Sequence, residues 1–284
     1  MRRHTAIGYL TMDIVINANH PTIEQHLTSI SHYGNFYHNL FASLAVPDYP
    51  PVADLLRTQH HLASGMWLIV SPVYWQATHN DAMIIACGND LTLPEKESRL
   101  WFEALREFLA QENIQLYYHD AFTWLLQCDG QPTIKAKPVS TLKHQSLMVE
   151  LQQLDRTLFW QRLITEIQMF FSSHALNKVR LDHPINGVWI WGGGELPSHS
   201  AAPLVSFDRK TMALASLLST QVLLYHPTLR IPRQAVLLVD EVSDQELIQL
   251  QERFKQTSVR WYWNNMAYLT KPTHWVSRLL EKFK

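Results

Sequence analysis

The stretch best suited to chemistry lies between residues 186 and 197 and holds four of the nine glycines. Residues 188–191 are β-branched and aromatic and predict a buried strand. The glycines end this strand, and Pro197 prevents the backbone from pairing again. A glycine triplet lets a neighbour approach the backbone closely. That neighbour could be an anion bound by backbone N–H groups or a helix of the same protein. This candidate ligand-binding or structural loop comprises Asn186, Trp189, Trp191, Gly192, Gly193, Gly194 and Glu195.

Common nucleotide-binding signatures do not fit these glycines. No Lys-Ser or Lys-Thr pair follows them, so they do not form a P-loop. Their spacing also differs from G-x-G-x-x-G, and no helix is expected directly behind the triplet. The sequence therefore leaves packing and anion binding as open alternatives, with packing favoured.

Other residues of catalytic type lack companions. Asp240 and Glu241 follow an apolar strand, at the end where α/β proteins place sites, but a role at a strand end or helix cap fits them as well. The pair Asp182 and His183 resembles half of a metal motif, and Cys87 has no activating neighbour in the sequence. No G-x-S-x-G elbow occurs. We therefore expect no catalytic residues, no metal ligands and no cofactor.

A histidine series in the first forty residues resembles a metal-binding ladder. Its members recur every six residues, at His20, His26, His32 and His38. On a helix, a step of six residues turns successive side chains by roughly 240°, so they cannot meet at one ion. We expect solvated histidines.

Composition limits the partners and the compartment. Charged residues make up 17% of the 284 residues, below the usual ~25%, while Trp, Tyr and Phe number ten, ten and eleven. With so few charges, some apolar surface should be exposed or covered by a protein partner. A net charge of −1 argues against nucleic-acid binding, and no run of about 18 apolar residues predicts a transmembrane segment. Two isolated cysteines and the lack of a signal-peptide core favour a cytoplasmic protein.

Periodicity predicts strands alternating with helices. We expect an α/β fold in which helices flank a mixed sheet. The irregular, Pro- and Lys-containing residues 131–154 are the best linker candidate. They would separate an N-terminal half (1–130) from a C-terminal half with the glycine loop (155–284), unless the chain forms one continuous domain. The expected strands are 7–15, 66–70, 82–87, 114–118, 122–127, 188–191, 203–207, 222–225, 235–239 and 259–264, and the expected helices are 21–33 (continuing through 36–44), 52–62, 93–109, 156–174, 209–221, 243–256 and 272–283.

The helix expected at 156–174 precedes the glycine loop and carries the candidate supporting residues Glu166, Gln168 and His174. Glu166 and Gln168 are two residues apart and face about 200° from each other, so they cannot share a pocket. An exposed Glu166 would pair with Arg162. A buried Glu166 would accept hydrogen bonds from the glycine loop and act as a structural clasp.

Two segments together resemble a known bacterial family. Residues 159–171, with Glu166, Gln168 and Met169, and residues 184–197, reading P-I-N-G-V-W-I-W-G-G-G-E-L-P, are similar to the RpfE-type regulatory proteins, often labelled cofactor-independent phosphoglycerate-mutase-like. Residues 67–73 resemble an earlier segment of that family, with Ser71 where Asp is usual. The resemblance covers about residues 60–200. It implies a degenerate phosphoglycerate-mutase-like fold and a relic phosphate pocket.

The mutases themselves use two metal ions and a serine nucleophile, whose motifs are not found in this sequence. The composition also resembles that of DotZ-type accessory subunits of the Dot/Icm type IV secretion coupling complex. Together these resemblances imply a non-catalytic interaction or adaptor subunit on an enzyme-like fold, with other protein subunits as partners. The alternative is a metal-dependent phosphomutase or phosphate-ester hydrolase that uses the glycine loop.

Overall fold

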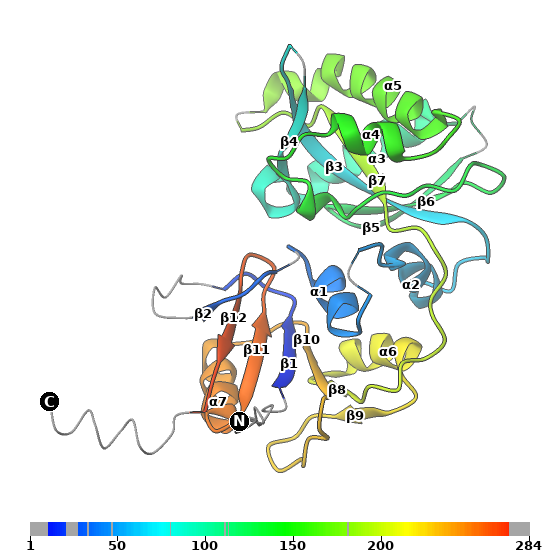
Figure 1. Ribbon diagram of the computed structural model, residues 1–284. Coiled ribbons are helices and arrows are strands. Elements are labelled where there is room, and N and C mark those ends of the chain that lie inside the picture. Colours follow the sequence, from blue (N-terminus) through cyan, green and yellow to red (C-terminus); the bar gives the residue numbers. More distant parts are fainter. Residues whose placement is uncertain are drawn as a thin grey trace, which may run out of the picture. The chain divides into compact units, whose positions relative to one another are not determined.

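The computed structural model describes residues 11–20, 28–32, 34–46, 48–79, 81–110, 112, 114–180 and 182–272. The chain forms two compact units. Unit 1 combines Met1–Ala45 with Pro197–Lys284, and unit 2 is the inserted segment Val46–Leu196. Both are α/β structures in which helices flank a sheet, which confirms the predicted fold class (Figure 1).

Unit 1 is built on a mixed sheet. Five neighbouring strands run parallel in the order β11-β1-β10-β8-β9. Beyond β11, β12 pairs antiparallel with β11, and β2 pairs antiparallel with β12. The strands are β1 (Thr11–Ile16), β2 (Thr28–Ser29), β8 (Leu204–Ser206), β9 (Val222–Leu224), β10 (Val236–Val239), β11 (Ser258–Tyr262) and β12 (Ala267–Thr270). Of the two central strands, β10 is a continuous apolar run and β1 is apolar except at Thr11 and Asp13, as burial on both faces of a parallel sheet favours.

Among the described residues of unit 1, three segments form α-helices: α1 (Phe36–Ser43), α6 (Arg209–Leu218) and α7 (Asp244–Phe254). Reciprocal capping boxes begin two of them, at Asp208 for α6 and at Ser243 for α7. In each box a side chain accepts from the backbone N–H three residues on, and the side chain at that position bonds back to the cap. The start of the helix expected at 243–256 is therefore confirmed.

Unit 2 is built on an antiparallel sheet around the long strand β3 (Trp67–Ala77). One side of β3 pairs with β7 (Gly187–Trp191), and the other pairs first with β6 (Thr123–Gln127) and then with β4 (Ala82–Cys87). β5 (Gln115–Asp120) pairs with β6 at the edge. The four predicted strands β4, β5, β6 and β7 all form, with shifts of a few residues at most.

The strand expected at 66–70 is longer than predicted, because β3 continues through Pro72 to Ala77. Val73 accepts a hydrogen bond from the backbone of Asn186, so its backbone groups point to the β7 side. Alternation then turns the nitrogen of Pro72 to the other side, where pairing with β6 has ended at Val70 and pairing with β4 begins at Val73. The missing N–H of proline costs no ladder bond at that junction.

Helices cover both faces of this sheet. α2 (Val52–Gln59) packs on β3 and β6, whereas α3 (Glu95–Phe108) and α5 (Phe159–Ser173) lie together on the opposite face (Figure 1). The rings of Trp101 and Phe171 join α3 to α5 at 4.7 Å. The remaining helical segments are α4 (Met148–Gln153) and three short 3₁₀ turns, Gly88–Leu91, Val139–Thr141 and Ala175–Val179.

The predicted linker at 131–154 lies inside unit 2, so the limits of the two units differ from the predicted halves. The indole N–H of Trp160 donates to the carbonyl of Pro132, and that of Trp189 donates to the carbonyl of Lys137. Leu142 is also fully buried. An irregular segment was mistaken for a linker because its packing partners are distant in sequence. The predicted helix at 272–283 and the strand start at 7–10 fall wholly or mainly outside the described residues. Of the predicted helix at 21–33, residues 28–32 are described, and they are not helical, because Thr28–Ser29 forms β2.

Candidate functional site

The glycine loop packs against its own sheet. All five residues of β7 are buried, and Gly192 and Gly194 have φ angles of 76° and 120°, which disfavour side chains. Gly193 is required for a different reason. A Cβ there would lie 2.5 Å from Leu68, and one at Gly192 would lie 2.8 Å from Ile69. The side chains of β3 therefore pack directly against these two glycines, at the positions that a Cβ would take.

The anion that holds this loop comes from the protein itself. The carboxylate of Asp54 on α2 accepts from the backbone N–H of Leu196 at 2.8 Å, and its second oxygen accepts from Arg57 at 2.7 Å. The N–H of Ala53 donates to the carbonyl of Gly192 at 3.0 Å. We call Asp54, Ala53, Gly192 and Leu196 the loop clasp. It ties the first helix of unit 2 to the last residues of unit 2.

The other predicted loop residues have structural contacts. The amide of Asn186 bonds both backbone groups of Trp75, accepting at 2.7 Å and donating at 2.8 Å. The indole N–H of Trp191 donates to the hydroxyl of Ser71 at 3.0 Å, in a buried pair. Ser71, which stands where the resembled family has Asp, thus serves as an acceptor for a core tryptophan. Glu195 is exposed.

The predicted supporting helix contacts β7, but not through the residues named for it. α5 turns Leu163, Ile164 and Ile167 inward. Glu166 is exposed, so the buried-Glu166 clasp does not form. Gln168 donates to Ser172 on its own helix, and His174 accepts from the N–H of Leu176 at the helix end. A clasp on this loop was one of the two alternatives that the sequence left open, but its carboxylate comes from Asp54 on α2 and not from α5.

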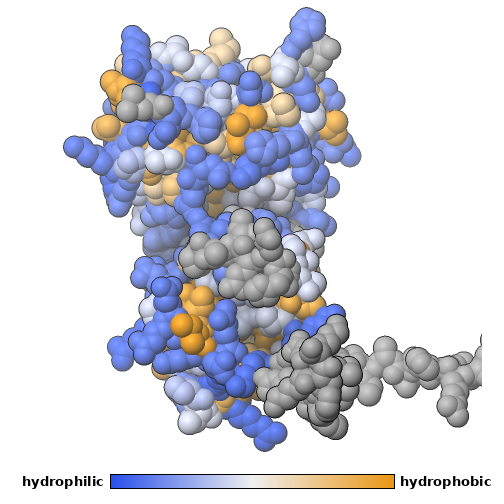
Figure 2. All heavy atoms as spheres, turned by 90° about the vertical axis from the view of Figure 1, so that its left-hand side faces the viewer, coloured by the Kyte–Doolittle hydropathy of each residue, from blue (hydrophilic) through white to orange (hydrophobic). Residues whose placement is uncertain are grey.

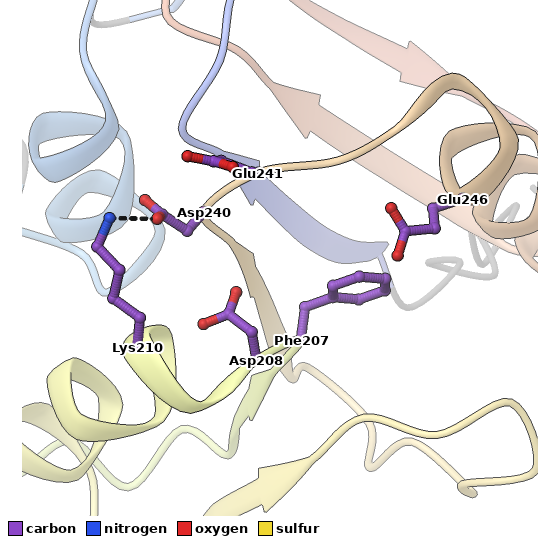
Figure 3. A pocket seen from close by; sticks show the side chains of 6 residues that line it. All are labelled: Phe207, Asp208, Lys210, Asp240, Glu241 and Glu246. Atoms are coloured by element: carbon purple, nitrogen blue, oxygen red, sulfur yellow. Dashed lines mark hydrogen bonds and ion pairs between the residues drawn. The ribbon is translucent and has the colours of Figure 1, made fainter.

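A second candidate site lies at the carboxyl ends of the parallel strands of unit 1. β8 leads through α6 to β9 on one side, while β10 leads through α7 to β11 on the other. The crossovers thus diverge between β8 and β10, which makes this a topological switch point, where open α/β sheets bind ligands. An open hollow of about 510 Å³ lies there, lined by Phe207, Asp208, Lys210, Asp240, Glu241 and Glu246 (Figure 3).

The central carboxylate of this hollow is bonded by donors of the chain. Asp240, which follows β10, accepts from the amide of Asn17 at 2.7 Å and forms an ion pair with Lys210 of α6. Figure 3 shows the Lys210 ammonium at the Asp240 carboxylate. That hydrogen bond, with the nearby charges of Glu241 and Asp208, raises the pKa of Lys210. The cation is therefore held in its charged form.

Two further carboxylates of the hollow serve as helix caps. Asp208 accepts from the N–H of Thr211 at the start of α6. Glu246 accepts from the hydroxyl and N–H of Ser243, and these bonds lower its pKa. In the part of the chain that the structure describes, no three His, Cys, Asp or Glu side chains converge as metal ligands.

Sequence reasoning named Asp240 and Glu241 but missed Lys210 as their companion. A lysine in the first turn of a helix that follows a parallel strand was the available signal, because that turn lies at the carboxyl edge of the sheet. Both cysteines are buried, and burial raises the pKa of Cys87 to about 11 and that of Cys128 to about 12. Neither is an activated thiol.

Comparison with known proteins adds little to this description. No protein-family model and no curated protein matches the chain. Among solved structures, a cofactor-independent phosphoglycerate mutase from Thermoplasma acidophilum is similar over 92% of this chain and 89% of its own, with 11% identity and a TM-score of 0.34. That neighbour is of the predicted mutase kind, but a likeness this low carries no argument of its own. The resemblance to RpfE-type proteins stays a prediction.

Proposed function

We propose that the protein is a non-catalytic interaction or adaptor subunit on an α/β scaffold of the kind enzymes use. The observation that carries the proposal is the bonding of Asp240 at the switch point. Both its oxygens accept from the chain, one from Asn17 and one from Lys210. Where an α/β enzyme would direct a carboxylate at a metal ion or substrate, this chain supplies its own cation.

Exposed apolar side chains on the helices of unit 2 support a protein partner. Met169 on α5 is 67% exposed, and Val179, just beyond α5, is 79% exposed. Leu100 on the neighbouring helix α3 and Leu158 before α5 are also more than half exposed. In Figure 2 hydrophobic residues reach the surface at several separate places. Such side chains act as anchors when a partner surface covers them.

The proposed setting follows from the sequence. The free, buried cysteines fit a reducing cytoplasm. No helix among the described residues is both long and apolar enough to cross a membrane. Within this class, the compositional resemblance to DotZ-type subunits makes a type IV secretion coupling complex our proposed assembly. Phosphate chemistry at the glycine loop is the less favoured alternative, because Leu68 and Ile69 pack against its glycines.

The test is a turnover screen on the purified full chain. Phosphate monoesters and phosphoglycerates would be offered with Mg²⁺, Mn²⁺ or Zn²⁺. We expect no turnover above that of the Asp240→Asn variant. Metal-dependent turnover that is lost in Asp240→Asn, with an unchanged circular dichroism spectrum, would overturn the proposal.

A second arm tests the interaction directly. Crosslinking in cell extract would compare the wild type with Met169→Glu, and Glu166→Ala serves as the matched control on the exposed side of α5. We expect a partner that is retained by the wild type and the control but lost in Met169→Glu. Equal capture by all three would remove α5 from the proposed surface.

A further inference from the structure

Two histidines of unit 2 face each other between a helix and a strand. His60 ends α2, and His119 lies on the edge strand β5. Nε2 of His60 is 2.8 Å from Nδ1 of His119. Each ring has an oxygen near its other nitrogen: the hydroxyl of Tyr117 is 3.4 Å from Nδ1 of His60, and the carboxylate of Asp120 is 3.6 Å from Nε2 of His119.

These neighbours select one arrangement of protons. An ionised carboxylate only accepts, so Asp120 favours a proton on Nε2 of His119. In a neutral ring this leaves Nδ1 of His119 as an acceptor, and His60 must then donate from Nε2. Nδ1 of His60 is left to accept from the hydroxyl of Tyr117. The hydroxyl of Tyr117 thus donates to His60, His60 donates to His119, and His119 donates to Asp120, so the three donors form one directed series.

Charged and titratable side chains flank the pair. On α2, Asp54 and Arg57 pair with each other at 2.7 Å, and His61, just after this helix, adds a further ring. Asp120 is the acidic group from β5. The strand β6 places Leu125 opposite Tyr117, on the same face of the sheet. Asp120 can therefore balance one added proton on the pair.

We propose that His60 and His119 form a pH-sensitive joint that holds α2 to β5 while the pair carries at most one added proton. When both rings are protonated, Nε2 of His60 and Nδ1 of His119 are both N–H donors and cannot bond to each other. The contact then breaks, and the end of α2 separates from the edge strand. This joint does not depend on the proposed adaptor function.

The sign of the pH effect follows from the lowered pKa of His60, which burial and then the charge of His61 cause. In the unfolded chain His60 takes a proton as the pH falls through its ordinary pKa near 6.5, while the folded protein still resists protonation. The unfolded state therefore binds more protons, and the joint's stabilisation, complete above that pH, is lost progressively as the pH falls below it.

The first test is imidazole ¹⁵N NMR on the full chain. At pH 8 we expect both rings to carry their proton on Nε2, and on acidification we expect two titration steps for the pair that lie more than one pH unit apart. A mixture of tautomers with two independent midpoints near the ordinary value would overturn the proposal. Binding of one equivalent of added Zn²⁺ at this pair would also overturn it, since a metal ion would then replace the shared proton.

A second measurement compares denaturant unfolding at pH 8 and at pH 5. His119→Gln keeps an acceptor for His60 but cannot be protonated, and His199→Gln removes an exposed histidine as the matched control. On acidification we expect the folding equilibrium constant to fall about tenfold more in the wild type and His199→Gln than in His119→Gln, because the two rings of the pair interact. Equal losses in all three proteins would contradict the joint.

Discussion

The glycine loop of unit 2 and the strand edge of unit 1 both look like binding sites in the sequence, but their structures differ. At the loop, the side chains of Leu68 and Ile69 fill the space beside the glycines. At the strand edge, an open hollow remains, and a charge pair of Lys210 and Asp240 lies in it. A conspicuous motif thus marks a packing constraint, while the position of residues at the carboxyl ends of parallel strands marks the open site.

The largest expected effect separates crowding from ligand binding at the loop. Gly193→Val should destabilise the protein by about 2 kcal/mol, because its Cβ would overlap Leu68, whereas the φ angle of Gly193 needs no glycine. Denaturant unfolding measures this. Gly130→Ala is the control, since Gly130 has a φ of 82° and open space, so that variant tests backbone strain alone.

Combining Gly193→Val with Leu68→Ala tests the role of Leu68. If Leu68 is the obstacle, the double variant should lose less unfolding free energy than the two single variants lose in sum, because the smaller side chain makes room for valine. Strict additivity would show that the loop is not packed against Leu68 and would return it to the candidates for ligand binding.

An intermediate effect tests the loop clasp. Asp54→Ala removes the acceptor for the N–H of Leu196 and should cost about 1–2 kcal/mol in unfolding free energy. Asp54→Asn keeps an oxygen acceptor and should lose less. If Asp54→Ala and Asp54→Asn were both as stable as the wild type, the loop would not need the carboxylate.

The smallest effect concerns Glu166, which the sequence allowed as a clasp residue if it were buried. Because its side chain is exposed on α5, Glu166→Ala should change the free energy of unfolding by less than about 0.5 kcal/mol. A loss as large as that of Asp54→Ala would contradict the exposed position and restore Glu166 as a clasp residue.

Local patterns predicted much of the fold. The apolar strand before Asp240 and the start of the helix at residue 243 depend on neighbours in sequence, and both formed as expected. The continuation of β3 through Pro72 did not follow from local rules, because it depends on where β6 ends and β4 begins. β12 was missed as well. It forms by pairing with β11 and has only four residues.

The candidate sites were predictable to a smaller extent. Asp240 was visible at the end of its strand, but its bonds to Asn17 and Lys210 join residues 223 and 30 positions away, respectively. The glycine triplet was visible too, while the choice between packing and ligand binding depended on Leu68, 125 positions earlier in the sequence (193 − 68). Contacts of this range require the folded structure.

Equilibrium binding of Mn²⁺ tests whether Lys210 serves as the chain's own cation at the strand edge of unit 1. We expect no stoichiometric Mn²⁺ on the wild-type chain. Lys210→Met should gain Mn²⁺ binding, because it frees Asp240 beside Asp208 and Glu241, and adding Asp240→Asn should abolish that gain. One Mn²⁺ bound per wild-type chain and lost in Asp240→Asn would show instead that Asp240 is a metal ligand.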